Sequence, residues 1–190
     1  VVIMTPTREL VLQVSGVLRG LLQHTTALRS SFVAGGFALH EDVARLAADS
    51  PNILVGTPGR LAQHLQHTPN FVHAIQSTEV MVLDEADRLL DATLVHQVDY
   101  VMRCVSSSPQ TLLCSATFNP LVRSFAVRTM CADFQMLDLA DPFNATSVGV
   151  AHEETEVVPQ VEQVLVRYQA REFTSTLLAV LQQEFQIAER

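Results

Sequence analysis

The sequence predicts an α/β fold in which helices cover both faces of a mostly parallel β-sheet. Short apolar runs alternate with segments whose apolar residues recur at helical spacing. The clearest of these runs is Val80–Leu83, which leads directly into Asp84, Glu85, Ala86 and Asp87. A run of this kind is typical of a buried strand in a parallel sheet, and its carboxyl end lies at the edge where such sheets bind ligands.

The expected elements follow in order along the chain. Strands are predicted at Val1–Met4, Ser31–Ala34, Ile53–Val55, Val80–Leu83, Thr111–Cys114 and Phe134–Leu139. Leu10, Val14, Val17 and Leu21 recur at helical spacing after Thr7, a suitable N-cap. Further helices are predicted at His40–Ala48 with Val43, Leu46 and Ala47 inward, from Leu61 onward, at Val95–Val105 and at Pro120–Met130.

The pattern of the chain changes after residue 140. Residues 141–159 are polar and acidic, with Glu153, Glu154 and Glu156 in close succession, and we interpret them as a linker between domains. Beyond it, one strand at Val161–Tyr168 and one helix at Phe173–Phe185 are expected. The sequence therefore predicts a main domain at 1–140 and the start of a second unit at 160–190.

Composition limits the classes of function. The net charge of −8 gives no overall basic surface, so any binding of nucleic acid must use a local patch. No apolar run reaches membrane-spanning length, so no membrane partner is expected. Cys104, Cys114 and Cys131 lack metal-ligand spacing and are typical of an intracellular protein. Nucleolar or nuclear, cytoplasmic and mitochondrial locations are all compatible with these features.

Two features indicate a missing amino-terminal segment. The chain begins with Val1-Val2-Ile3-Met4, which has the character of a strand and lacks an initiator Met. All 12 basic residues are Arg, so the chain has no lysine for a Walker A loop, whose Lys contacts the β- and γ-phosphates of a nucleotide. We therefore expect the sequence to start inside a longer protein.

Five motifs together resemble one family. Pro6-Thr7-Arg8-Glu9-Leu10, Gly35-Gly36, Thr57-Pro58-Gly59-Arg60, Asp84-Glu85-Ala86-Asp87 and Ser115-Ala116-Thr117 stand in the order seen in DEAD-box RNA helicases. The resemblance covers nearly the whole chain and identifies residues 1–140 as a first RecA-like domain of the P-loop NTPase class, lacking its Walker A strand. The stretch Val158-Pro159-Gln160-Val161-Glu162-Gln163 resembles the family's entry into a second RecA-like domain, so residues 160–190 are identified as the start of that domain.

The resemblance implies a nucleotide site that uses ATP and Mg²⁺. Asp84 would bind Mg²⁺ directly or through water, and Glu85 would activate the hydrolytic water. Asp87 would hydrogen-bond the hydroxyls of Ser115 and Thr117 and so couple the site to the next strand. From the residues alone two alternatives stay open: Asp84 as the N-cap of an acidic helix start, and Ser115 and Thr117 as caps of the helix near Pro120.

The resemblance also implies RNA as a partner, bound through its sugar-phosphate backbone with little sequence preference. The residues expected to bind it lie at the ends of three strands: Pro6, Thr7, Arg8, Gly35, Gly36, Thr57, Pro58, Gly59 and Arg60. Glycines allow backbone N–H groups close to phosphates, and Arg8 and Arg60 supply positive charge. The glycine and proline pairs are also typical of ordinary turns, and the two interpretations coexist.

The predicted function is that of an ATP-dependent RNA helicase, which couples ATP hydrolysis to RNA binding and to duplex unwinding or remodelling of ribonucleoproteins. The Walker A loop and the arginine finger of the second domain are absent from the sequence, so we expect residues 1–190 to be inactive by themselves. The alternative is a truncated, non-catalytic module that binds RNA or a protein partner. Protein cofactors are unknown.

Overall fold

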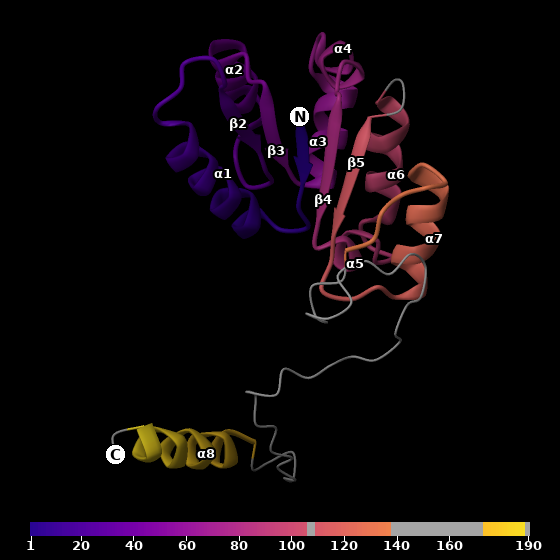
Figure 1. Cartoon of the computed structure of the whole chain (residues 1–190). Coiled ribbons are helices and arrows are strands. Elements are labelled where there is room, and N and C mark those ends of the chain that lie inside the picture. The colour runs from indigo at the N-terminus through magenta and orange to yellow at the C-terminus, as the bar shows by residue number, and fades with distance from the viewer. Residues whose placement is uncertain (106–108, 138–172, 189–190) are drawn as a thin grey trace. The chain divides into compact units, whose positions relative to one another are not determined.

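The computed structural model describes residues 1–105, 109–137 and 173–188. The chain divides into two compact units, Val1–Glu153 and Glu154–Arg190. The first unit contains the β-sheet (Figure 1). In the second unit the structure describes one helix, α8 (Phe173–Ala188), at the place where the sequence predicts a helix.

The sheet has five parallel strands in the order β2-β3-β1-β4-β5. These strands are β1 (Val2–Met4), β2 (Ser30–Val33), β3 (Ile53–Gly56), β4 (Val80–Asp84) and β5 (Gln110–Cys114). The central strand β1 pairs Val2 with Leu54 of β3 on one side and with Met81 of β4 on the other. Because every described pairing is parallel, all five strands end at the same edge of the sheet, which confirms the predicted architecture.

Seven helices of the first unit are described. They are α1 (Arg8–Leu22), α2 (Leu39–Asp49), α3 (Pro58–His67), α4 (Phe71–Gln76), α5 (Ala86–Leu89), α6 (Val95–Cys104) and α7 (Pro120–Thr129). Helices α4 and α5 were not predicted, because they are too short to show a helical repeat of apolar residues. Within the described residues, no helix is both long enough and apolar enough to span a membrane.

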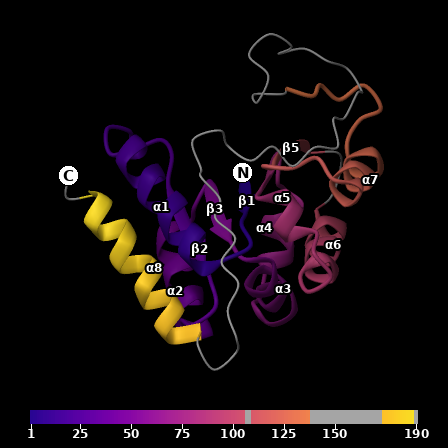
Figure 2. The same ribbon diagram turned by 90° about the horizontal axis from the view of Figure 1, so that it is seen from below.

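Two apolar cores lie on opposite faces of the sheet. The smaller core contains Val11 of α1 and Val55 of β3, with Phe32 and Phe37 packed against it. The larger core collects residues of α3, α4, α6 and α7 against β1 and β4. Figure 1 and Figure 2 show α1 on one side of the sheet and α3 and α6 on the other. Helices on both faces explain why the strands read as nearly continuous apolar runs.

Helix α1 turns a different face to the sheet than its spacing suggested. Val17 and Leu21 are 59% and 71% exposed, whereas Val11 and Ser15 are buried. Apolar residues lie all round this helix, so the repeat alone does not identify the buried side. The side of α1 that packs against the strands is the one that contains Val11.

Helix α2 corrects a second expectation. Val43 and Leu46 are half-buried and Ala47 is exposed, although all three were predicted to face inward. The buried residue of this helix is Asp42, which is 0% exposed. The side of α2 that faces the interior therefore has a carboxylate as its fully buried group, and its apolar residues are at most half-buried.

The predicted strand at Phe134–Leu139 is wrong for the residues that the structure describes. Residues 134–137 form no strand, and the N–H of Phe134 instead donates to the carbonyl of Cys131 in a turn. Residues 138 and 139, the predicted linker at 141–159 and the predicted strand at Val161–Tyr168 lie outside the described residues.

Strand β5 forms an edge of the sheet in the part of the chain that the structure describes. Among the described strands it pairs with β4 alone, from Val80–Gln110 to Asp84–Cys114. Leu112 in the middle of β5 is 45% exposed. A free strand edge beside exposed apolar side chains is a surface on which chains associate.

We therefore predict that Leu112→Lys lowers the aggregation of purified residues 1–190, because a charge on an edge strand opposes edge-to-edge pairing. Light scattering during concentration measures the effect. Leu121→Lys is the matched control, since Leu121 is 56% exposed but lies on α7. Equal improvement by both variants would show that general solubility, and not the edge of β5, is responsible.

Candidate nucleotide and nucleic-acid site

The carboxyl edge of the sheet gathers every motif that the sequence analysis singled out. Pro6–Arg8 follow β1, Gly35 and Gly36 follow β2, and Thr57–Arg60 follow β3. The acidic motif begins at the last residue of β4, and Ser115–Thr117 follow β5. Segments as distant in sequence as Pro6 and Thr117 therefore lie along one edge, where open α/β sheets bind ligands.

The acidic motif makes a tight bend directly after β4. The N–H of Glu85 donates to Oδ1 of Asp84 at 3.1 Å, and Glu85 has a left-handed backbone with φ of 52°. A left-handed conformation is uncommon for a residue with a side chain, and such strain concentrates at functional sites. Glu85, and not Asp84, is the residue before α5, so the alternative with Asp84 as N-cap is wrong.

The carboxylate of Glu85 has a neighbour of opposite charge. Nη1 of Arg88 donates to Oε2 of Glu85 at 2.9 Å. Both side chains are solvent-exposed, at 36% for Glu85 and 62% for Arg88, so water screens this ion pair. The ion pair therefore restrains the Glu85 side chain only weakly, and its carboxylate remains accessible at the edge of the sheet.

Hydrogen bonds join the acidic motif to the segment after β5. The hydroxyl of Thr117 donates to Oδ2 of Asp87 at 2.9 Å, which is the contact that the family resemblance implied. Ser115 differs: its Oγ accepts from the backbone N–H of Asp87 at 3.3 Å and donates to the carbonyl of Thr117 at 2.7 Å. Two neighbouring strand ends are thus linked through Asp87.

The helix after this segment has its own cap. Oδ1 of Asn119 accepts from the N–H of Val122 at 3.0 Å, and Pro120 occupies the first helical position of α7. Ser115 and Thr117 make no N-cap bond to this helix in the described contacts, which answers the alternative that they are simple caps.

Most residues expected to bind RNA surround one open cavity of about 550 Å³. Seven of the nine line it, together with Gln63 and Leu94: Pro6, Arg8, Gly35, Gly36, Thr57, Gly59 and Arg60. Of the other two, Thr7 caps α1 by accepting from the N–H of Leu10 at 3.3 Å, and Pro58 is the buried first residue of α3. A neighbouring cavity of about 300 Å³ is lined by Thr7, Asp87 and Arg88 and shares Pro6 and Leu94.

Arg8 is the exposed cation of this surface. Its guanidinium carbon lies 5.1 Å from the centre of the Phe37 ring, which is within the range of a cation–π contact. Gly36 has φ of 89°, and a Cβ on it would collide with Nη1 of Arg8. The backbone conformation therefore favours glycine here, and a side chain at this position would also displace the Arg8 guanidinium.

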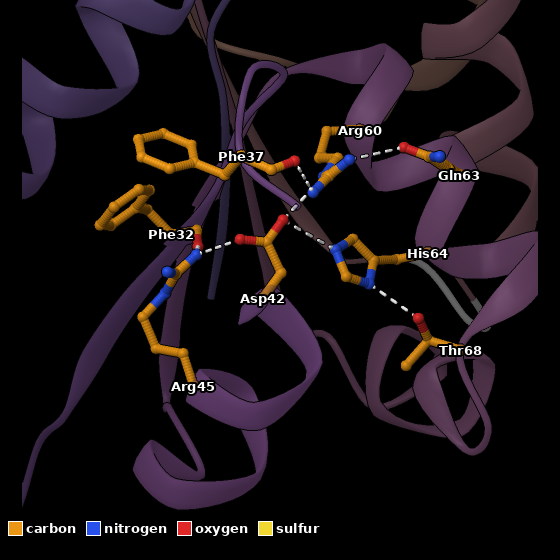
Figure 3. Close-up of polar contacts among 8 residues, drawn as sticks. All are labelled: Phe32, Phe37, Asp42, Arg45, Arg60, Gln63, His64 and Thr68. Atoms are coloured by element: carbon orange, nitrogen blue, oxygen red, sulfur yellow. Dashed lines mark hydrogen bonds and ion pairs between the residues drawn. The ribbon is translucent and has the colours of Figure 1, made fainter. Parts of the chain in front are cut away.

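Arg60 occupies a different environment. It is 8% exposed, and its guanidinium donates to Oδ2 of Asp42 at 2.7 Å, to Oε1 of Gln63 at 2.8 Å and to the carbonyl of Phe37 at 2.7 Å (Figure 3). The predicted cation of this motif is thus ion-paired inside the protein, although its edge reaches the cavity wall.

Asp42 and His64 were not among the residues predicted for this site. Both are 0% exposed, and Nε2 of His64 lies 3.3 Å from Oδ2 of Asp42. Nδ1 of His64 lies 2.8 Å from the hydroxyl of Thr68. Asp42 stands four residues before Leu46, on the same side of the helix, and that spacing was the available signal for a buried acid.

Burial lowers the pKa of His64 below its usual value of 6.5, and the hydrogen bond to Asp42 opposes this shift in part. A neutral His64 donates from Nε2 to Asp42 and accepts the Thr68 hydroxyl at Nδ1. His64 therefore completes the shell around the Asp42 carboxylate without adding a third positive charge beside Arg45 and Arg60.

The acidic end of β4 fits a magnesium ion. Mg²⁺ prefers oxygen ligands and is usually held by one or two carboxylates together with substrate phosphates and waters. Asp84 presents a half-buried carboxylate at the sheet edge, with Glu85 next to it. Within the described residues no group of three or more metal-binding side chains occurs.

Comparison with known proteins assigns the family. The model of the DEAD/DEAH box helicase family matches residues 1–125. DEAD-box ATP-dependent RNA helicase 25 of Oryza sativa subsp. japonica is 37% identical over 136 residues, which are 72% of this chain and 23% of that protein. Probable ATP-dependent RNA helicase DDX27 of Homo sapiens is 35% identical over 167 residues, which are 88% of this chain and 20% of that protein.

Solved structures agree with the sequence comparison. The yeast DEAD-box splicing factor Prp28 superposes with a TM-score of 0.62 at 30% identity, covering 68% of this chain and 31% of that chain. The DEAD-box helicase Mss116 bound to ssRNA and UDP-BeF superposes with a TM-score of 0.60 at 28% identity, covering 68% of this chain and 27% of that chain.

The chain belongs to the DEAD/DEAH box helicase family. Its parallel sheet is that of a RecA-like domain, as the sequence predicted. The chain spans about a fifth to a quarter of the length of these curated relatives.

The lowered pKa of His64 predicts a pH-dependent stability. The unfolded state binds a proton near pH 6.5 and the folded state only at lower pH, so the free energy of unfolding falls as the pH drops below about 6.5. The slope for one proton is at most about 1.4 kcal/mol per pH unit. Urea unfolding of wild type and His64→Gln between pH 7.5 and 5 measures it.

The control is His67→Gln, because His67 is exposed on the same helix. We expect His64→Gln to flatten the pH dependence and His67→Gln to leave it unchanged. An equally steep loss of stability in His64→Gln would assign the pH dependence to another group.

Proposed function

We propose that this chain forms the RNA-binding and metal-binding part of an ATP-dependent RNA helicase, as its first RecA-like domain. The protein would couple ATP hydrolysis to RNA binding and to the unwinding of duplexes or remodelling of ribonucleoproteins. The observation that carries the proposal is the cavity at the carboxyl edge, which brings together the ends of β1, β2 and β3 beside the acidic end of β4.

The cavity suits the sugar-phosphate backbone of RNA. Gly35 and Gly36 expose backbone that a phosphate can approach closely, and α3 begins at Pro58 with its amino end at the same edge. Arg8 adds a positive charge that solvent reaches. Groups of this kind contact phosphates and do not distinguish bases, so the protein would bind single strands of any sequence.

The acidic end of β4 suits ATP with Mg²⁺. Asp84 would hold the metal ion, directly or through water, and Glu85 would take a proton from the attacking water. Glu85 is accessible, and Arg88 is its described partner. The bound ion would neutralise charge that develops on the phosphates.

The bond between Thr117 and Asp87 would couple the two activities. Asp87 lies on α5, three residues after the proposed metal ligand Asp84, and contacts the segment that follows β5. It also lines the cavity that shares Pro6 with the RNA surface. A movement at the nucleotide would therefore reach residues beside the RNA through a short covalent and hydrogen-bonded path.

We predict that Glu85→Gln in the full-length protein abolishes RNA-stimulated ATP hydrolysis and leaves ATP binding within about twofold, because the amide keeps the shape of the side chain but cannot accept the proton. Phosphate release and nucleotide titration measure the two quantities. Glu79→Gln makes the same change at an exposed residue just before β4 and should have no effect. Near wild-type turnover in Glu85→Gln would remove Glu85 from the catalytic role.

We predict that Arg8→Ala weakens the binding of unrelated single-stranded RNA sequences by similar factors and reduces the slope of log Kd against log salt by about one unit or less. Fluorescence anisotropy at several KCl concentrations measures both. Arg19→Ala removes an exposed charge from the last turn of the same helix and should change neither. A loss confined to one RNA sequence would indicate that Arg8 reads bases.

A further inference from the structure

A single buried carboxylate receives three partners from two helices. Asp42 of α2 pairs with Arg45 on its own helix and with Arg60 on α3. His64, also on α3, completes the shell (Figure 3). The side chain of Asp42 is 0% exposed, so water does not reach it and no RNA contacts it directly.

The same network holds the loop after β2. Nη2 of Arg60 donates to the carbonyl of Phe37, the residue that follows Gly35 and Gly36. Nη2 of Arg45 donates to the carbonyl of Phe32 at 2.9 Å, and its guanidinium lies 4.3 Å from the centre of the Phe32 ring. Asp42 thus orients two arginines that each fix a backbone carbonyl of the β2 segment.

The contacts continue to the exposed surface. The rings of Phe37 and Phe32 pack edge-on, with their centres 5.8 Å apart. The guanidinium of Arg8 lies over the ring of Phe37. Arg60 also lies in the first turn of α3, and the N-terminal end of this helix supplies Thr57 and Gly59 to the cavity. The positions of Arg8, Gly36 and Thr57 relative to one another therefore depend on the bonds that Asp42 makes.

We infer that Asp42 is a positioning residue for RNA binding, and that Arg60 holds the loop after β2 against the start of α3 and is not a phosphate ligand. This inference rests on the proposed RNA-binding function. Arg60 is ion-paired with Asp42 inside the protein, and Arg45, the second arginine on Asp42, does not line the cavity. Arg8 therefore supplies the exposed positive charge of this surface that RNA meets.

Removing the charge of Asp42 separates this role from simple electrostatics. Asp42→Asn deletes a negative charge beneath a surface that binds phosphates, so electrostatics alone predicts tighter binding and a steeper salt slope. If Arg60 were a phosphate ligand, loss of its ion pair with Asp42 would also leave its guanidinium available to bind RNA. The positioning role predicts the opposite result, because the loops lose their common anchor.

The experiment measures the binding of oligouridylate to the full-length protein at several KCl concentrations, with thermal melting to check folding. We expect Asp42→Asn to weaken binding on the order of tenfold with the salt slope unchanged. The matched control is Glu41→Gln, which removes a charge from the neighbouring exposed residue and should bind as tightly as wild type or slightly more tightly. Binding of Asp42→Asn at wild-type strength or above would overturn the inference.

Asp42→Asn leaves Arg60 buried without a full counter-charge and so risks unfolding. The double variant Asp42→Asn/Arg60→Gln removes both charges and keeps polar groups at both positions. We expect it to fold and to bind weakly with the wild-type salt slope, whereas loss of about one unit of slope would show that Arg60 contacts phosphate.

Two results separate this inference from the proposed function. If Arg8→Ala leaves RNA binding unchanged, the proposed RNA surface itself is wrong. If Arg8→Ala weakens binding but the Asp42 variants bind normally, only the positioning role of Asp42 is wrong.

Discussion

The ion pair between Asp42 and Arg60 is the interaction on which the arrangement of the candidate RNA surface depends. It joins α2 to α3, and through the carbonyl of Phe37 it joins both to the glycine loop after β2. A buried pair of this kind contributes little net stability compared with apolar packing, but loss of one partner is costly. The ion pair therefore contributes mainly by fixing the position of the start of α3 relative to the glycine loop after β2.

The parallel sheet provides the second constraint. Because β1, β2, β3, β4 and β5 all run in the same direction, the segments that follow them meet at one edge, and no segment has to extend far from the core to reach its neighbours. The acidic end of β4 lies between the segment after β1 and the segment after β5. The same topology thus places the proposed nucleotide chemistry next to the proposed RNA surface, with Asp87 and Thr117 bonded between them.

Local patterns were sufficient to predict the five described strands, the larger helices and the motif residues at the sheet edge, because strand ends and glycine loops are encoded by neighbouring residues. They were insufficient where tertiary packing decides. The buried face of α1 depends on the strands beneath it, which is why Val17 and Leu21 are exposed. Residues 134–137 have the alternation of a strand but form none, because the N–H of Phe134 bonds to the carbonyl of Cys131 in a turn. The spacing to Leu46 places Asp42 on the inward side of α2, but its partners Arg60 and His64 stand 18 and 22 residues further along the chain, and no local pattern identifies them.

The most direct test of this account follows the Arg60 side chain in the wild-type protein while RNA binds. In ¹⁵N-labelled full-length protein, the Nε–H signal of Arg60 should be protected from exchange by its bond to Asp42 and should keep its position when oligouridylate is added. The Nε–H signal of the exposed Arg8 should shift in the same titration. A large shift of the Arg60 signal toward that of a phosphate-bound guanidinium, with loss of the bond to Asp42, would contradict the account.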